Sequence, residues 1–406
     1  MRILKRISLF LGIIVVAVGA LVAGLAFKWW PDSWDRQMIS YLQQNPVRYR
    51  LLLEKFPRLG LSEAAHSVLV RLSKQQQIDK KLLAEFQSGG YTLEKPFLML
   101  DPYGIAPLSA LLYFETEEPV RVTLHIAGTA ANTSVTHEFA KEGYCRKHLL
   151  PVYGLYADKE NVITVSCRNQ QGQSRTQQLR LQTEKLTGYV AEGQRKILVY
   201  QQDKYQPGMN FSSSSVACAG IKHAFDAEGQ VRWIFTDRCL FSGNSFDEGR
   251  HIYRVYGQND QGTPLGAVVT QESLLGRIEA LYYIPLGEHH EIRVTPEKTL
   301  LVGTNHWETA EDGLLELDLK TGKQLLSVDY DRLLPRQRRV GSYHLRNTAD
   351  WAHINSMVRY QDEYISSSNF QSAVFRHSPK GEIRWLLSDP EAYPEKWQQY
   401  LLKPLG

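Results

Sequence analysis

A short motif occurs three times in the second half of the 406-residue chain and restricts the folds open to it. In each copy an apolar strand is followed by a polar turn that contains glycine and then by a second apolar strand. The copies are Phe225–Trp233, Leu317–Leu325 and His377–Trp385. Repetition of one hairpin unit is the sequence mark of a β-propeller, in which each hairpin forms the outer strands of a blade. A plain sandwich or barrel does not require such copies.

Two histidines hold matching positions relative to these hairpins. His290-Glu291-Ile292 and His353-Ile354-Asn355 each precede a hairpin at a similar distance. Because the innermost strands of a propeller converge on its axis, we expect His290 and His353 to face one channel. Alternation along a strand would turn His289 away from the side that His290 faces, and the direction of His306 is undetermined.

Histidine suits chemistry in such a channel, since its neutral form can attack or accept a proton and its charged form can stabilise an anion. A buried structural role is the plain alternative, and the residues alone leave both open. A second alternative is that the histidines bind a metal ion. The sequence contains no His-x-x-x-His spacing, so we expect no metal.

The region 91–187 carries short strand-like runs in which apolar and polar residues alternate. Turn residues such as Gln171-Gly172 separate them, which favours a small antiparallel β-sandwich. The runs are Ala110–Phe114, Val120–Ile126, Val162–Cys167 and Gln178–Leu181. The preceding region, 31–90, predicts short helices that include Ser62–Leu72 and Ile78–Phe86, the latter closed by Gly89-Gly90. The fold class is therefore mainly β, with a partial propeller over 188–406.

The first 30 residues predict a membrane anchor or a signal segment. Ile7–Phe27 is uncharged and long enough to cross a bilayer as a helix. The basic residues before it place the N-terminus in the cytoplasm, so we expect an inner-membrane anchor and a periplasmic globular part. Gly24-Leu25-Ala26 would permit cleavage as a signal peptide, whereas Trp29 and Trp30 favour an uncleaved anchor.

The cysteines allow disulfide bonds. Four cysteines in a chain expected to face an oxidising compartment predict two disulfides. We expect Cys145–Cys167 and Cys218–Cys239; the other connectivities and free buried thiols remain alternatives.

The net charge of +4 is spread along the chain, which argues against nucleic acid as a partner.

Several segments resemble consecutive parts of the bacterial arylsulfate sulfotransferases. In the second half these are Asp350–Met357, Ile365–Val374 and Gly381–Trp385. In the first half, Pro102–Ala110 and Leu150–Tyr156 resemble the N-terminal domain of that family. Two sets of motifs in the right order make a chance match improbable, and the resemblance covers most of the chain from Tyr91 onward.

The resemblance implies transfer of a sulfuryl group from a phenolic sulfate ester to another phenol through a sulfated histidine, without a cofactor. By motif matching, His290 and His353 belong to the catalytic, sulfate-binding cluster and Asn355 supports His353. The substrate-binding arginine of the family is replaced by Asn369, which removes a cation from the site. The resemblance also implies a homodimer.

The family's propeller has six blades, and six blades of about 40 to 45 residues each need more chain than 188–406 provides. The nucleophilic histidine of the family lies in a blade beyond the segment that matches Trp385. We therefore expect an incomplete propeller and impaired transfer, from a truncated sequence or a degenerate relative. The alternatives are an inactive propeller that binds an aromatic or anionic ligand, and an envelope scaffold.

Overall fold

The computed structural model describes most of the chain from Glu63 onward. The described residues are 63–130, 132–139, 143–187, 208–214, 221–237, 244–247, 251–256, 267–284, 286–305, 311–334 and 351–403. The predicted membrane segment Ile7–Phe27, His306 and the pair Cys218–Cys239 lie outside them. No helix in these ranges combines the length and the apolar character that a bilayer span requires.

One long helix, α4 (Glu63–Ser88), replaces the two helices that the sequence predicted. Four of the five residues that link the two predicted helices are Lys74 and three glutamines, which are good helix formers, so the helix continues through them. Gln75 is buried because its side-chain amide pairs with the backbone N–H and C=O of Ile278. The predicted end is confirmed, since Gly89 and Gly90 have φ angles of 71° and 86°.

The region after α4 forms one curled antiparallel sheet of six strands, where two separate sheets were expected. Its long strand β2 pairs with β1 and β4 along its first half and with β3 and β5 along its second half. The predicted runs Ala110–Phe114 and Val120–Ile126 are both parts of β2. The strands are β1 (Phe97–Leu100), β2 (Ser109–Ile126), β3 (Val135–Glu138), β4 (Cys145–Tyr153), β5 (Glu160–Asn169) and β6 (Ser174–Gln182).

The two halves of β2 are buried differently, as their sequences require. From Val120 to Ile126 apolar residues alternate with exposed or half-buried ones, because only one face meets the core. From Ser109 to Phe114 every residue is buried. Leu111 and Tyr113 on the outer face pack against Leu82 and Phe86 of α4, so the helix covers the second face of the strand.

Four antiparallel sheets follow in the described residues, and each is a meander of neighbouring strands. The three predicted hairpins are confirmed as β8–β9, β16–β17 and β20–β21. The strands are β7 (Asn210–Ser214), β8 (Ile221–Phe225) and β9 (Val231–Ile234); β10 (Asn244–Asp247), β11 (His251–Tyr256), β12 (Ala267–Ser273) and β13 (Ile278–Ile284); β14 (Glu288–Val294), β15 (Thr299–Thr304), β16 (Gly313–Asp318) and β17 (Gln324–Asp329); β18 (Ile354–Tyr360), β19 (Glu363–Ser368), β20 (Ala373–His377) and β21 (Ile383–Leu387).

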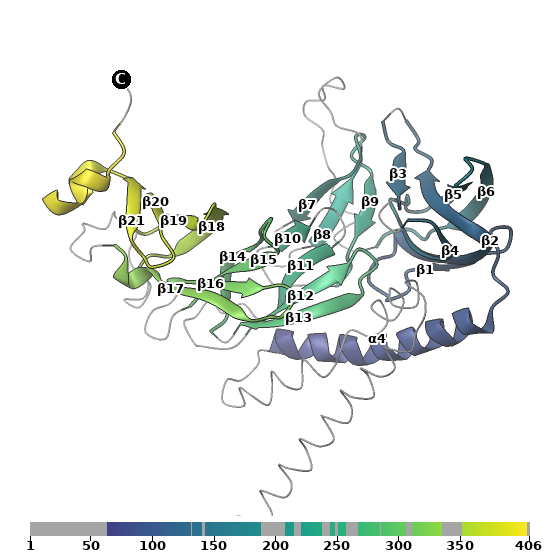
Figure 1. Ribbon diagram of the computed structural model, residues 1–406, viewed down its shortest axis with the longest axis horizontal. Coiled ribbons are helices and arrows are strands. Elements are labelled where there is room, and N and C mark those ends of the chain that lie inside the picture. The colour runs from purple at the N-terminus through teal and green to yellow at the C-terminus, as the bar shows by residue number, and fades with distance from the viewer. Residues whose placement is uncertain are drawn as a thin grey trace, which may run out of the picture.

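These sheets form a curved row, with the six-stranded sheet at one end and β18–β21 at the other (Figure 1). Helix α4 runs beneath the six-stranded sheet and the sheet β10–β13. The first strands of successive sheets lie side by side, since β10 contacts β14 and β14 contacts β18. The molecule is therefore mainly β and built from consecutive antiparallel sheets, as expected, and its first strands gather along one line.

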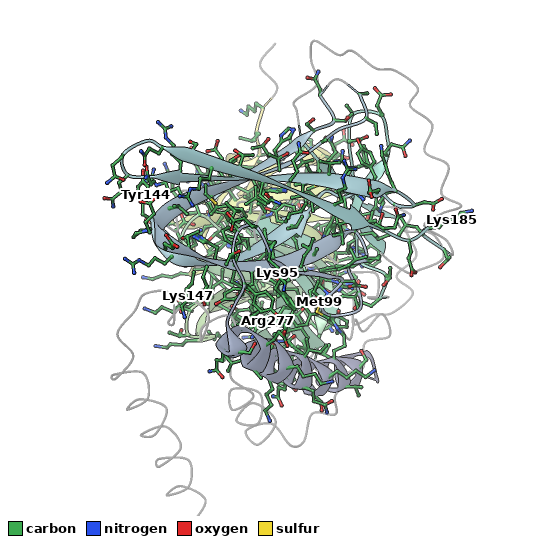
Figure 2. The ribbon with its side chains drawn as sticks, turned by 90° about the vertical axis from the view of Figure 1, so that its right-hand side faces the viewer. Lys95, Met99, Tyr144, Lys147, Lys185 and Arg277 are labelled. Atoms are coloured by element: carbon green, nitrogen blue, oxygen red, sulfur yellow. The ribbon has the colours of Figure 1, made fainter. Side chains whose placement is uncertain are left out.

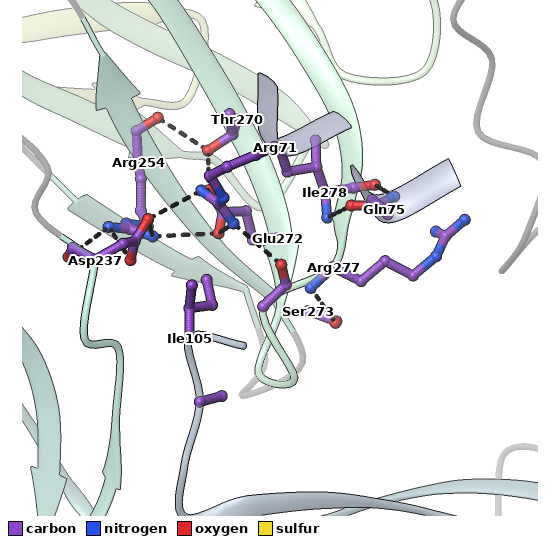
Figure 3. Close-up of polar contacts among 12 residues, drawn as sticks. Arg71, Gln75, Ile105, Asp237, Arg254, Thr270, Glu272, Ser273, Arg277 and Ile278 are labelled. Carbon is purple, nitrogen blue, oxygen red and sulfur yellow. Dashed lines mark hydrogen bonds and ion pairs between the residues drawn. The ribbon is translucent and has the colours of Figure 1, made fainter. Parts of the chain in front are cut away.

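A buried ion network joins α4 to the sheet β10–β13 (Figure 3). Arg71 of α4 donates to Glu272 at 2.9 Å, and Arg254 donates to the same carboxylate at 3.2 Å. Asp237 accepts from both arginines, at 3.1 Å from Arg71 and 3.0 Å from Arg254. Burial by itself would raise the pKa of Glu272, but the two guanidinium groups outweigh it and lower this pKa to about 2.

A second buried contact lies about two turns further along the helix. Asp79 of α4 accepts from Arg277 at 3.0 Å and from the hydroxyl of Tyr103 at 2.8 Å. Figure 2 shows Arg277 just above the helix. Because Tyr103 precedes β2 and Arg277 precedes β13, Asp79 ties the helix to both the six-stranded sheet and its neighbour.

The predicted disulfide Cys145–Cys167 does not form, since both cysteines are free thiols. Cys145 pairs with Val120 on one edge of β2, and Cys167 pairs with Val122 on the other edge. Strands on either side of a third are about 9 to 10 Å apart, whereas a disulfide needs Cα atoms within about 7 Å. The proximity in sequence was misleading because β2 lies between the two strands.

The ion network predicts a specific acid sensitivity. The depressed pKa of Glu272 stabilises the fold above its ordinary value of 4.5, and this contribution is lost as the pH falls from 4.5 towards 2. Glu272→Gln removes the more deeply buried of the two carboxylates that Arg71 and Arg254 share, so we expect a loss of about 3 to 5 kcal/mol at pH 7. Thermal unfolding followed by circular dichroism at several pH values measures both effects.

The matched control is Glu160→Gln, which removes an exposed partner of Arg180. Its unfolding temperature should stay close to that of the unaltered chain. Equal losses in the two variants, or an unchanged acid dependence in Glu272→Gln, would contradict the assigned role of the network.

Candidate functional site

The site begins at an irregularity near the start of β14. Glu288 pairs with Thr304 and Ile292 pairs with Val302, so three residues of β14 lie opposite Gly303 alone. A side chain at Gly303 would collide with the backbone carbonyl of His289, and glycine is therefore required where the bulge approaches β15. The bulge turns the His289-His290 pair out of the regular pleat.

The prediction that His289 faces away from His290 is wrong, and the bulge is the reason. His290 has a φ of 59°, a left-handed conformation that breaks the alternation of side chains along the strand. The two rings consequently lie together, with their centroids 3.8 Å apart. His289 is almost fully buried, whereas His290 is half-buried.

Glu311 joins two of the histidines. Its Oε2 atom lies 3.0 Å from Nε2 of His289 and 2.5 Å from Nδ1 of His353. Burial alone would raise the pKa of Glu311, but the contacts with His289 and His353 outweigh it and lower this pKa to about 2. The carboxylate is therefore ionised at neutral pH, and it fixes the orientation of the His289 and His353 rings.

The adjacent carboxylate, Asp312, positions the backbone that carries His353. It accepts from the N–H groups of Trp351, Ala352 and His353 at 3.1, 2.6 and 3.0 Å. The N–H of Ile354 donates to the carbonyl of Glu311 at 3.0 Å, so the start of β18 is bound to the segment before β16. His353 also has a left-handed backbone, with a φ of 49°.

The two histidines singled out in the sequence are brought together. Nε2 of His290 lies 3.3 Å from Nε2 of His353, and the ring of Phe370 stacks on His353 with centroids 4.6 Å apart. Burial lowers the pKa of His290 to about 4, with further lowering from His289 and His353. His290 is therefore neutral at pH 7.

The two asparagines lie near this cluster in different ways. The backbone N–H of Asn369 donates to the carbonyl of His353 at 3.0 Å, while the Asn369 side chain is exposed. Asn355 is half-buried in β18 and is the extra residue where the pairing with β19 shifts. The backbone of residue 369 therefore lies beside His353. The family resemblance places an arginine at this position, where this chain has Asn369.

The arrangement offers two kinds of chemistry. Imidazole N–H groups can donate hydrogen bonds to an anion, and imidazole lone pairs can bind a metal. The ligand atoms of His289, His290 and His353 all lie within 4.8 Å of one another. The histidines and the carboxylate that appeared unconnected in the sequence thus form one cluster in space.

Sequence reasoning missed His289, Glu311 and Asp312. The only available signal was the position of the Glu311-Asp312 pair, directly before a strand that opens with Gly313. Such acidic pairs are common in turns, so the pattern could not be distinguished from a solvated loop.

Comparison with protein families gives two matches that follow one another along the chain. A model described as arylsulfotransferase (ASST) matches residues 195–406. A model described as the arylsulfotransferase Ig-like domain matches residues 97–184. The first match includes every residue of the histidine cluster.

Two curated relatives carry the description arylsulfate sulfotransferase AssT, one from Lelliottia amnigena and one from Escherichia coli O6:H1 (strain CFT073). Each is 22% identical over 403 residues, which cover 76% of this chain and 66% of the relative. This chain therefore spans slightly less than two thirds of the length of these relatives. Among solved structures, a protein of unknown function from Bacteroides caccae is 8% identical, with 67% of this chain and 96% of that chain covered and a TM-score of 0.29, too low to add to the argument.

The role of Asp312 is testable. Asp312→Ala leaves three backbone N–H groups without their acceptor, and unsatisfied buried donors cost about 1 to 3 kcal/mol each. We expect a loss of about 3 kcal/mol or more in thermal unfolding, together with shifted ring-proton resonances of His353 in NMR spectra.

Asp389→Ala serves as the control, because exposed Asp389 caps one N–H of a short 3₁₀ helix. It should lower stability far less and leave the His353 resonances in place. Unchanged histidine resonances in Asp312→Ala would show that Asp312 does not position this ring.

Proposed function

Because the chain belongs to the arylsulfotransferase family, whose matched models cover both of its β regions, we propose that it binds an aryl sulfate ester and serves transfer of the sulfuryl group to a phenol. Membership supports sulfuryl transfer at the level of the family. The substrates and the residues assigned to them are part of the proposal.

The observation that carries the proposal is the meeting of His290 and His353, with 3.3 Å between their Nε2 atoms. They come from β14 and from the start of β18, so two separate sheets contribute to one polar group. A sulfate group carries its charge on several oxygens and accepts hydrogen bonds from N–H groups on more than one side. Two converging imidazoles suit this acceptor when each carries a proton on Nε2; because Nδ1 of His353 contacts Glu311, this requires His353 in its protonated form.

The expected reaction consists of two displacements. In the first, a histidine nitrogen attacks sulfur, an N–S bond forms, and the S–O bond to the donor breaks; the departing phenolate takes up a proton. In the second, the hydroxyl of the acceptor loses its proton and attacks sulfur, which releases the histidine. Donors fixed around the equatorial oxygens stabilise the charge that develops on the group in transfer.

In this scheme His290 and His353 hold the sulfate, and Glu311 fixes the orientation of His353. A neutral imidazole such as that of His290 donates a weaker hydrogen bond to an anion than a guanidinium does, so Asn369 in place of an arginine weakens the site. Impaired transfer is therefore part of the proposal, and the alternative of a ligand-binding protein without turnover predicts the same binding.

The proposal extends to the setting of the site. The described sheets are blades of a β-propeller, and the line of first strands is its channel. Ile7–Phe27 anchors the chain in the inner membrane, with the globular part in the periplasm. A homodimer is the expected assembly.

Isothermal titration with phenyl sulfate tests the binding step. His353→Ala removes a hydrogen bond to a charged group, and such bonds contribute about 1.5 to 3 kcal/mol, so we expect affinity to fall about 10- to 100-fold. His125→Ala is the matched control, because His125 is exposed on the six-stranded sheet. Equal affinity in the unaltered chain and in His353→Ala would reject this site.

The replacement of the family's arginine by Asn369 gives a second test. Asn369→Arg places a guanidinium beside His353, and we expect it to tighten phenyl sulfate binding about 10-fold. Asn369→Gln, a longer but neutral side chain, should leave the affinity near its starting value. An equal gain in phenyl sulfate affinity in Asn369→Gln would show that the longer side chain, and not its charge, causes the tighter binding.

A further inference from the structure

The distance between two of the histidines matches that between two ligands of one metal ion. Zinc binds imidazole nitrogens at about 2.0 to 2.1 Å in tetrahedral geometry, which places neighbouring nitrogens about 3.3 to 3.4 Å apart. Nε2 of His290 and Nε2 of His353 are 3.3 Å apart. These two atoms are already at the separation that a shared zinc ion would require.

His289 completes the set. The ligand atoms of the three histidines lie within 4.8 Å of one another, so small ring movements would bring all three nitrogens to the tetrahedral separation of about 3.3 to 3.4 Å. Nδ1 of His289 is buried, and none of the residues described in the structure forms a hydrogen bond with it. A metal ion would give this nitrogen a partner.

Glu311 supplies the support that metal-binding histidines usually have. Ligating imidazoles commonly use their second nitrogen to contact a carboxylate, which fixes the ring and raises its basicity. Oε2 of Glu311 contacts Nε2 of His289 and Nδ1 of His353. For both residues the other ring nitrogen is therefore the candidate ligand atom.

We propose that His289, His290 and His353 form a binding site for a Zn²⁺ ion, with Glu311 as a positioning residue. Three imidazoles suit zinc among the divalent metals, and three protein ligands leave a fourth coordination position open. The left-handed backbones of His290, Glu311 and His353 hold these side chains in one place.

The open position has a consequence for substrate binding. An oxygen of a sulfate ester can occupy it, and the ion then supplies the positive charge that Asn369 does not. This consequence rests on the function proposed above, whereas the metal site itself does not.

Metal binding by the full chain, stripped with EDTA, tests the site. We expect one Zn²⁺ per chain by isothermal titration, and affinity at least 100-fold lower in His289→Ala and His353→Ala. Glu311→Gln should lose about 10- to 100-fold, the usual effect of removing a supporting carboxylate. His125→Ala should bind zinc as the unaltered chain does, and unfolding of each metal-free variant checks its fold.

A measurement without any variant keeps the test decisive. X-ray absorption of the zinc-loaded chain should show three imidazoles around the metal. Absence of stoichiometric binding, or a spectrum without imidazole ligands, would overturn the metal site, while phenyl sulfate binding in EDTA that depends on His353 would leave the proposed function standing. Zinc binding with no effect on phenyl sulfate affinity would preserve the site and reject its link to the substrate.

Discussion

The candidate site depends on two adjacent carboxylates. Asp312 collects the three N–H groups that lead into β18, and Glu311 contacts the rings of His289 and His353. The dipeptide precedes β16, whereas the groups that it binds belong to β14 and to the start of β18. Because an unsatisfied buried donor is costly, this pair fixes how two sheets meet and where their histidines lie.

Buried carboxylates also fix the contact between α4 and the sheet β10–β13, with a different result. Glu272 of β12 is held by Arg71 of α4, and Asp79 of α4 is held by Arg277, directly before β13. These buried charges specify one arrangement of helix and sheets, since an alternative packing would leave a charge without its partner. The histidine cluster differs because its rings retain nitrogens that can act on a ligand.

Much of the fold could be read from local patterns. The three hairpins were predicted because each turn carries its own glycine and polar residues, and the strands on either side are adjacent in sequence. The end of α4 was predicted from Gly89-Gly90. The continuity of α4 was missed because Gln75, polar in sequence, is buried by pairing with Ile278, and the Cys145–Cys167 disulfide failed because β2 lies between the two strands.

The sequence by itself determined the kinds of elements, the family and the meeting of His290 with His353, since a repeated unit places equivalent residues at equivalent positions. Only the tertiary structure decided that His289 and Glu311 join them. A bulge opposite Gly303 and a left-handed backbone at His290 cancel the alternation on which the sequence argument relied. Glu311 reaches the site through contacts between sheets, and periodicity within one strand contains no information about such contacts.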